Sequence, residues 1–462
     1  MRARKQLMVP VLFVLIILLS TFSIYILIKR TSIYSYEVEE DYKYSFNKTA
    51  ANITNLNLKN GKITLPEKQA SNQSTFLKVN IQTTFMGKYL LPSILMKGEK
   101  SSFTQYVEHG AKGIRYLNVS SLMDKKETLL RLQGNHVIVD DQTIQLITFK
   151  NQDINKLKIL VVAPHPDDAE IAAYGLYSSN KNSYILTITA GDAGRNKYDE
   201  VYKNKTKQYL KKGQLRTWNS ITVPMLGGIS PEQTINLGFF DSTLKTMFKD
   251  KSKQVSGVYT NTSDISTFRK QNISTLSSGL SGKSDWNSLV TNIEYLLKTI
   301  QPDIIITPYP ALDRHSDHKM SSVALFEAIK KSGIKNGYLY LYTNHFVLNE
   351  YYPYGKIFGA VSIPPNFGEE KYFDGVYSYN LTIDKQKDKI FALEAMNDLR
   401  LDTEWRTSRG AIKEARRNIR RDILGRSNSY YRRAVRSNEL FFVINIDNIY
   451  NQKILNRIVG EL

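Results

Sequence analysis

From about residue 153 onward, the chain alternates short apolar runs with segments of helical length, and this pattern constrains its fold more than any other feature. The apolar runs have the length of buried strands, and they lie at 158–163, 184–189, 234–240 and 304–308. Segments of helical length lie at 168–178, 198–226 and 286–299. Strands separated by helices of this length pair in parallel, with helices on the faces of the sheet. The sequence therefore predicts a doubly wound, mainly parallel α/β sheet.

The first of these strands ends abruptly in polar residues. Pro164 is followed by His165, and Asp167 and Asp168 come shortly after. Ligands of open α/β sheets bind at the carboxyl ends of the strands. A histidine and two adjacent carboxylates are costly to desolvate there without a metal ion. We therefore expect a metal site at this end of the sheet.

A hydrolytic zinc site needs three protein ligands and one open position for water. His165 and Asp168 are three residues apart across a strand-to-helix turn, so both can face one point. Asp167, between them, can stay off the metal and act as a general base on the bound water. The third ligand must come from a neighbouring strand end, and His318 lies shortly after the run at 304–308.

The second histidine cluster reads Asp313-Arg-His-Ser-Asp-His318. With His318 assigned to the metal, His315 is left to polarise the carbonyl group and to protonate the leaving amine. Asp313 or Asp317 is expected to orient His315.

His165-Pro-Asp-Asp, followed later by His-x-x-His, resembles the motifs of the PIG-L/LmbE-like de-N-acetylase family over roughly residues 156–350. This resemblance implies a Rossmann-like, zinc-dependent enzyme that removes the acetyl group from N-acetylglucosamine-type sugars. By the same resemblance, His165, Asp168 and His318 would bind zinc. Asp167 would be the catalytic base, and His315 the electrophilic or acid histidine.

Other positions match the family less completely. Asp192 lies in a glycine turn after the second strand, and 237–241 resembles the family's Leu-Gly-aromatic-x-Asp segment. Arg216 lies where the family has an arginine followed by a glutamate, but the glutamate is absent here. Arg195 and His345 are candidates for contacts with the substrate. Two other histidines are expected to be inert: His109 and His136.

The amino-terminal region is apolar. Residues 7–28 carry no charge, and this length is sufficient to cross a hydrocarbon core of about 30 Å. A cleaved signal peptide has a shorter apolar region that ends in small residues. We therefore expect residues 1–30 to be an uncleaved, single-pass transmembrane anchor. Basic residues lie on both sides of it, so charge favours an inside amino terminus only weakly; the catalytic domain is expected outside the cytoplasm, in the periplasm or at the cell surface.

Three further segments complete the predicted organisation. Residues 31–152 contain short alternating runs separated by turn signals, which predicts a small β-sandwich that either binds glycan or, as we favour, spaces the catalytic domain from the membrane. Within the catalytic domain, 153–462, the polar insertion at 243–285 is expected to be a lid or a disordered excursion. The arginine-rich region at 397–436 predicts an amphipathic basic helix, whose charged faces either are solvated or bind phosphate or carboxylate groups.

Composition narrows the classes of function. The formal net charge of +20 favours an anionic partner, such as an acidic glycan or membrane headgroups, over a neutral one. The sequence has no cysteine, which excludes thiolate nucleophiles and cysteine-bound zinc. It also contains no zinc-finger, RNA-binding or helix-turn-helix pattern, so no nucleic-acid partner is expected.

The sequence thus predicts a membrane-anchored, zinc-dependent amide hydrolase that deacetylates an envelope or lipid-linked glycan, and the positive net charge predicts that this glycan is anionic. Two alternatives stay open at this point. One is a non-catalytic, membrane-tethered protein that binds glycan on a retained hydrolase fold. The other is a hydrolase of a different acyl-amide on a small carrier.

Overall fold

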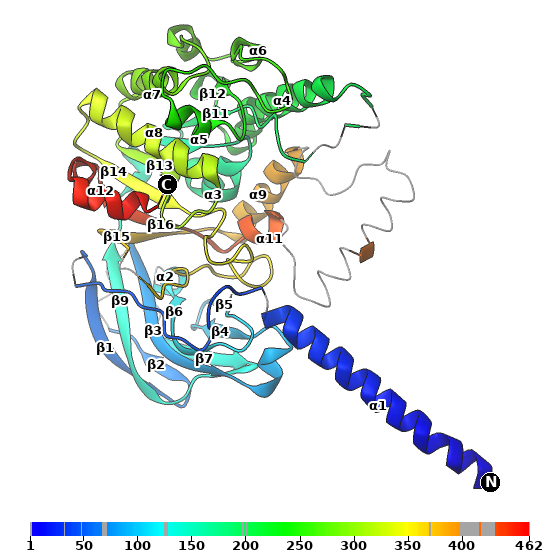
Figure 1. Ribbon diagram of the computed structural model, residues 1–462. Helices are drawn as coiled ribbons and strands as arrows, with labels where there is room; N and C mark the ends of the chain where they lie inside the picture. The colour runs from blue at the N-terminus through cyan, green and yellow to red at the C-terminus, as the bar shows by residue number, and fades with distance from the viewer. Residues whose placement is uncertain are drawn as a thin grey trace.

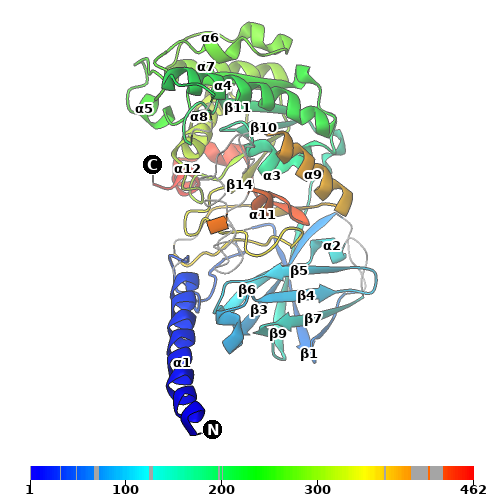
Figure 2. The ribbon, with the colours of Figure 1, turned by 90° about the vertical axis from the view of Figure 1, so that its right-hand side faces the viewer.

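The computed structural model describes residues 2–31, 33–47, 49–66, 72–123, 128–195, 198–199, 201–368, 371–396, 415–416 and 430–461. These residues form an α/β part, an all-β part packed beneath it, and an amino-terminal helix that extends away from both (Figures 1 and 2). The two parts are built on two separate sheets.

The α/β sheet has seven strands. In spatial order they are β12 (Thr234–Phe239), β11 (Ser183–Thr189), β10 (Ile159–Ala163), β13 (Ile304–Pro308), β14 (Tyr338–Tyr342), β16 (Asn438–Asn445) and β15 (Gly375–Asn380). The first five are parallel, and β16 and β15 pair antiparallel at one edge. The prediction of a mainly parallel sheet with helices is confirmed. The direction of strand succession reverses between β10 and β13, which is where such sheets bind ligands.

Helices cover both faces of this sheet. They are α3 (Asp168–Tyr177), α4 (Lys205–Thr222), α7 (Trp286–Ile300), α8 (Ser316–Ser332), α9 (Ile383–Ala395), α11 (Tyr430–Ala434) and α12 (Gln452–Val459). Alternate residues of β10 enter different cores: Ile159 and Val161 pack with residues of α3 and α9, whereas Leu160 and Val162 pack with residues of α7 and α8. The central strand is therefore buried on both faces, and this explains its continuous apolar sequence.

Helix α7 illustrates how the sequence sets these elements. The Asp285 side chain accepts a hydrogen bond from the backbone N–H of Ser288 and caps the first turn. Leu289, Ile293 and Leu296 recur at helical spacing and are fully buried. The helix ends at Gln301, which has the left-handed backbone conformation typical of a helix terminus.

The all-β part contains one antiparallel sheet of nine strands. They are β1 (Asn52–Lys59), β2 (Lys62–Thr64), β3 (Gln73–Thr83), β4 (Ser93–Lys97), β5 (Ser102–Tyr106), β6 (Lys112–Asn118), β7 (Leu129–Asn135), β8 (Val137–Ile138) and β9 (Gln142–Lys150). Leu77 of β3 and Ile94 of β4, which are far apart in the sheet, belong to one hydrophobic core. The predicted all-β character is confirmed, but the pairing runs unbroken through one curled sheet rather than two separate sheets. A short helix, α2 (Ser120–Met123), follows β6.

Aromatic side chains join the two parts. The Phe46 ring lies 6.0 Å from the Phe149 ring of the β sheet and 6.1 Å from the Phe373 ring of the α/β part, measured between centroids. The Asn118 side chain also donates 2.8 Å hydrogen bonds to the backbone oxygen of Val361 and the hydroxyl of Ser378. The β part is therefore packed directly against the α/β part. Its predicted roles in spacing or in glycan binding stay predictions.

Helix α1 (Arg2–Thr31) contains the apolar run at 7–28. Its large apolar side chains between Leu12 and Tyr25 are roughly half exposed or more. Within the described part of the chain, no helix combines the length and hydropathy of a membrane span. The transmembrane anchor therefore stays a prediction.

The insertion at 243–285 is a folded part of the domain, with helices α5 (Leu244–Lys249) and α6 (Ser266–Arg269). The Asn272 side chain accepts a 2.7 Å hydrogen bond from the backbone N–H of Asn236 on β12 and donates a 2.8 Å bond to its backbone oxygen. The insertion therefore covers the free edge of the sheet, which an exposed strand needs. The expectation of a disordered excursion was wrong, and the alternative role as a lid stays a prediction.

The predicted basic helix at 397–436 lies outside the described residues, except at 415–416 and 430–436. The remaining elements are 3₁₀ helices at Phe85–Lys88, Ile154–Lys156, Val223–Gly227, Pro231–Gln233, Thr275–Gly279 and Ile446–Tyr450.

Candidate metal centre

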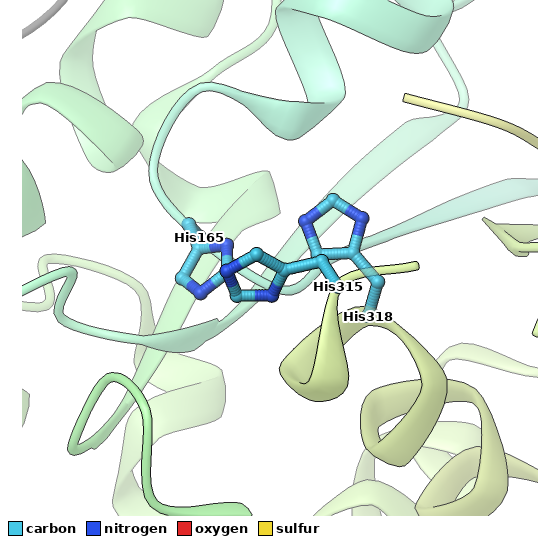
Figure 3. Close-up of side chains that lie close together, drawn as sticks. All are labelled: His165, His315 and His318. Carbon is cyan, nitrogen blue, oxygen red and sulfur yellow. The ribbon is translucent and has the colours of Figure 1, made fainter. Parts of the chain in front are cut away.

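Three histidines meet at the point where the strand succession reverses. His165 follows β10 and precedes α3, while His315 and His318 lie at the start of α8, after β13 (Figure 3). Their ring centroids are 4.8 Å apart for His165 and His315, 5.3 Å for His165 and His318, and 4.9 Å for His315 and His318. The fold thus brings together two clusters that are about 150 residues apart in the sequence.

The Asp168 carboxylate lies between two of these rings. Its Oδ2 atom is 3.2 Å from Nδ1 of His165 and 3.1 Å from Nε2 of His318. Both Asp168 and His318 are almost completely buried. The structure therefore places the three predicted zinc ligands in direct proximity.

Carboxylates surround both imidazole rings beside Asp168. Nδ1 of His318 lies 2.9 Å from Oδ2 of Asp313, so a metal ion would bind this ring through Nε2, which faces Asp168. Nε2 of His165 makes no hydrogen bond and lies 3.4 Å from Oδ1 of Asp241 and 3.5 Å from Oδ2 of Asp317, whereas Nδ1 lies 3.2 Å from Oδ2 of Asp168. A metal ion beside Asp168 would therefore bind His165 through Nδ1.

The residues present fit a metal ion. Nε2 of His318 is buried and makes no hydrogen bond, although Asp168 is only 3.1 Å away. If Nε2 of His318 and the Asp168 carboxylate both bind a metal ion, they do not need to form a hydrogen bond with each other. Two imidazoles and one carboxylate are a known ligand set for catalytic zinc. His165, Asp168 and His318 are the residues that would hold the ion.

Among the described residues, two groupings of donor atoms have the spacing for a metal ion: His165, His315 and His318, and His165, Asp241 and Asp317. The carboxylates of the second grouping already accept hydrogen bonds from Ser242, Asp317 from its backbone N–H and Asp241 from its hydroxyl. They lie 3.5 and 3.4 Å from Nε2 of His165, whereas Nδ1 of that ring faces Asp168.

The charges of the cluster also favour a cation. Burial opposes the ionisation of Asp168, but His318 and His165 outweigh it and hold its pKa well below the usual value. Burial lowers the pKa of His318, but Asp168 and Asp313 outweigh this effect and raise it to about 10. Burial likewise opposes the ionisation of Asp241, and His165 reverses it and lowers its pKa. Ionised carboxylates thus surround the imidazoles, and a bound cation would balance their charge.

Asp167 lies beside this cluster in an unusual backbone conformation. Its φ is 141°, a value that non-glycine residues rarely adopt, and such strain is common at functional sites. Its Oδ2 accepts a 2.8 Å hydrogen bond from Nη2 of Arg216, which also donates to the backbone oxygen of Pro166 at 2.8 Å. Helix α4, whose role the sequence left open, therefore delivers a buried arginine to the predicted catalytic base.

His315 is the N-cap residue of α8, and its Nδ1 is buried without a hydrogen-bond partner. Burial, together with the nearby rings of His165 and His318, lowers the pKa of His315 to about 4. The ring is therefore neutral at pH 7.

Nδ1 of the His315 ring makes no hydrogen bond to Asp313 or Asp317, contrary to the expected pairing. Asp313 instead pairs with the His318 ring through Oδ2, and its Oδ1 accepts a 2.9 Å hydrogen bond from the backbone N–H of His315. Asp317 accepts a 2.6 Å hydrogen bond from the backbone N–H of Ser242.

The remaining predicted residues lie around the cluster. Asp192 is fully buried, and its Oδ1 accepts a 2.9 Å hydrogen bond from the backbone N–H of Asp241, so it supports the loop that faces His165. The His345 ring lies 5.0 Å from the His318 ring and lines the site. Arg195 is exposed at the end of the glycine turn, and its role as a substrate contact stays a prediction.

Two histidines lie away from the site, as expected. His109 is buried in the β part, where its Nδ1 lies 3.1 Å from the hydroxyl of Tyr34. His136 lies at a turn between β7 and β8.

Sequence reasoning missed Asn344, whose side chain donates a 2.8 Å hydrogen bond to Oδ1 of Asp168. The available signal was its position, because it follows β14 at the same edge of the sheet as the other site residues. Asp241 was noted only as part of a resembling segment, and its contact with His165 was not expected.

Comparisons with known proteins agree with the motifs. The family model for PIG-L, GlcNAc-PI de-N-acetylase, matches residues 160–329. No curated protein matches the chain.

Several solved structures are similar to the chain at low identity. The A40926 pseudoaglycone deacetylase Dbv21 shares 15% identity at a TM-score of 0.33, and covers 63% of this chain and 98% of its own. The zinc-inhibited form of the teicoplanin deacetylase Orf2 shares 12% identity at a TM-score of 0.35, and covers 62% of this chain and 97% of its own. TM-scores this low support no inference about the substrate of this chain.

The matched residues 160–329 contain β10, the His165–Asp168 turn, α4 with Arg216, and the start of α8 with His315 and His318. The family assignment thus rests on the same residues that form the metal centre. Residues 160–329 thus form a region that matches the PIG-L de-N-acetylase family.

Proposed function

We propose that this protein is a zinc-dependent hydrolase that removes the N-acetyl group from an N-acetylglucosamine-type sugar in an envelope or lipid-linked glycan. The observation that carries this proposal is the position of Asp168, whose Oδ2 lies within 3.2 Å of both His165 and His318. Asp167 is adjacent and pairs with Arg216 rather than with either histidine. Three ligand residues and one separate carboxylate are the parts that metal-assisted amide hydrolysis needs.

His165, Asp168 and His318 would hold a zinc ion, which would make a water molecule more acidic and polarise the amide carbonyl. The Asp167 carboxylate takes a proton from the attacking water, and Arg216 holds it in place for this transfer. His315 is neutral at pH 7, because its pKa is about 4, and it donates a hydrogen bond to the oxygen on which negative charge develops.

The leaving amine needs a proton. Because of its low pKa, the His315 imidazole carries no extra proton at pH 7 that it could give to the amine. We therefore assign this proton transfer to Asp167, which has just received a proton from water. This changes the role expected for His315 from acid to hydrogen-bond donor. The products are acetate and a free amino sugar.

The substrate and its location rest on the sequence and the family. The formal net charge of +20 supports an anionic glycan or glycolipid. The uncharged run at 7–28 is the basis for proposing single-pass attachment to a membrane, with the catalytic domain outside the cytoplasm. A different acyl-amide on a small carrier is the main alternative for the substrate. A non-catalytic glycan-binding role is disfavoured, because all five motif residues are present and gathered at one site.

The test compares cells that express the wild-type chain with cells that express Asp167→Asn. Mass spectrometry of the envelope glycans is expected to show the loss of one acetyl group only with the wild-type chain. Identical glycans in both strains would contradict a glycan substrate. The zinc content of the purified wild-type chain is the control. If the chain binds zinc but the glycans are unchanged, the metal site exists and the substrate is a different one.

A further inference from the structure

The loop that follows β14 contributes two consecutive residues to the metal centre. Asn344 is 4% exposed, and its Nδ2 donates a 2.8 Å hydrogen bond to Oδ1 of Asp168. His345 lies next to the His318 ring. The hydrolytic role described above uses neither Asn344 nor the contacts that hold it.

The two oxygens of the Asp168 carboxylate have different partners, and Asn344 contacts one of them. The amide group of Asn344 engages Oδ1, while Oδ2 faces His165 and His318 and accepts a 3.0 Å hydrogen bond from the backbone N–H of His165. A carboxylate held at both oxygens cannot rotate freely about its side-chain bond. Asn344 thereby fixes which oxygen faces the two imidazoles.

Arg433 of α11 holds Asn344 in turn. Its Nη1 donates a 2.7 Å hydrogen bond to the backbone oxygen of Asn344, and its Nη2 contacts the backbone oxygen and Oε2 of Glu350 at 3.2 and 3.1 Å. Arg433 is 8% exposed. The planar guanidinium therefore bridges both ends of the loop at 344–350, a geometry that the single ammonium of lysine does not reproduce.

We propose that Asn344 and Arg433 are a positioning pair that sets Asp168 for metal binding, so that the carboxyl-terminal helix α11 governs the zinc affinity of a site formed by distant strands. This proposal rests on the zinc site of the proposed function. It also gives a role to one of the arginines in the region at 397–436: this guanidinium binds the protein's own backbone rather than an external anion.

The test measures the zinc affinity of the full-length chain by competition with a chromogenic chelator at pH 7. Asn344→Ala and Arg433→Met are each expected to weaken zinc binding by about 10-fold, within the range seen when residues that support metal ligands are removed. Asn219→Ala and Arg269→Met are matched controls, because these side chains also donate to backbone oxygens but lie away from the site. Both controls are expected to bind zinc as the wild type does.

The double variant tests whether the pair acts as one unit. If Arg433 acts through Asn344, the double variant loses no more affinity than the weaker-binding single variant. The proposal would be overturned if the losses of zinc affinity in the two single variants add up in the double variant, or if Asn344→Ala binds zinc as tightly as the wild type. A wild-type chain that binds no zinc would instead overturn the proposed function. Circular dichroism of each variant shows that the comparison is made between folded chains. Arg433→Lys keeps the positive charge but loses the planar guanidinium, so its zinc affinity is expected to resemble that of Arg433→Met.

Discussion

Arg216 donates a 2.8 Å hydrogen bond to Oδ2 of Asp167, although the two residues lie on different elements and 49 positions apart. Both side chains are about nine-tenths buried. The predicted catalytic base therefore has a fixed orientation that does not depend on the metal. Asp168, one residue later, pairs with His165, His318 and Asn344 instead.

Because Asp167 and Asp168 have different partners, we predict that the base function of Asp167 can be removed without loss of metal binding. Asp167→Asn should lower kcat by roughly 10²–10⁴-fold, because asparagine cannot accept the proton of water, and should leave the zinc affinity unchanged. Turnover of an N-acetylated sugar and chelator competition measure the two effects. Normal turnover in this variant would remove Asp167 from the mechanism.

Arg216 is expected to act on the rate through Asp167. Arg216→Met should lower kcat by about 10-fold or more with little change in zinc affinity, since the guanidinium touches the base and not the ligands. Arg269→Met is the control, because Arg269 lies on the edge-covering insertion. If Arg216→Met loses zinc instead, then Arg216 supports the metal site and not the base.

His315 and His318 should differ sharply, although their rings are only 4.9 Å apart. His318→Gln should abolish zinc binding, because Nε2 of His318 faces Asp168 and is the nitrogen that would bind the ion, whereas Nδ1 pairs with Asp313. His315→Gln should keep zinc and lose most of the turnover, since His315 is assigned to the developing oxyanion. Zinc content measured by atomic absorption after gel filtration distinguishes the two variants. Equal loss of zinc in both would make His315 a ligand.

Asp192 should make the protein less stable as the pH rises. Burial raises its pKa to about 7 from an ordinary value of 3.8, so the folded chain keeps a proton that the unfolded chain has released. The free energy of unfolding contributed by this group therefore falls between about pH 3.8 and pH 7 and is constant above that range.

Asp192→Asn removes this dependence and keeps an oxygen for the backbone N–H of Asp241. Relative to the wild type, the variant should gain roughly 1–3 kcal/mol more stability at pH 8 than at pH 5. Urea unfolding at both pH values measures the difference. If the difference in free energy of unfolding between variant and wild type is the same at both pH values, the pKa of Asp192 lies in its ordinary range.

Much of the catalytic fold follows from local sequence pattern. The run at 304–308 coincides with β13, and the run at 184–189 lies within β11, because a buried strand needs continuous apolar residues and ends where they end. The antiparallel strand β15 was not expected. Its sequence, Gly375–Asn380, has neither a long apolar run nor clear alternation, and it becomes a strand by pairing with β16.

The sequence by itself determined the metal ligands as candidates, because the residue types needed for hydrolytic zinc chemistry directly follow two strands, and strand ends of a parallel sheet meet at one edge. Only the tertiary structure decided how polar side chains pair. Asp313 binds His318 instead of His315, and Arg216 reaches Asp167. Arg433 reaches Asn344 across 89 positions. The physical reason is that strands and helices depend on neighbouring residues, whereas the partner of a buried polar group depends on which distant elements the packed fold brings within hydrogen-bond distance.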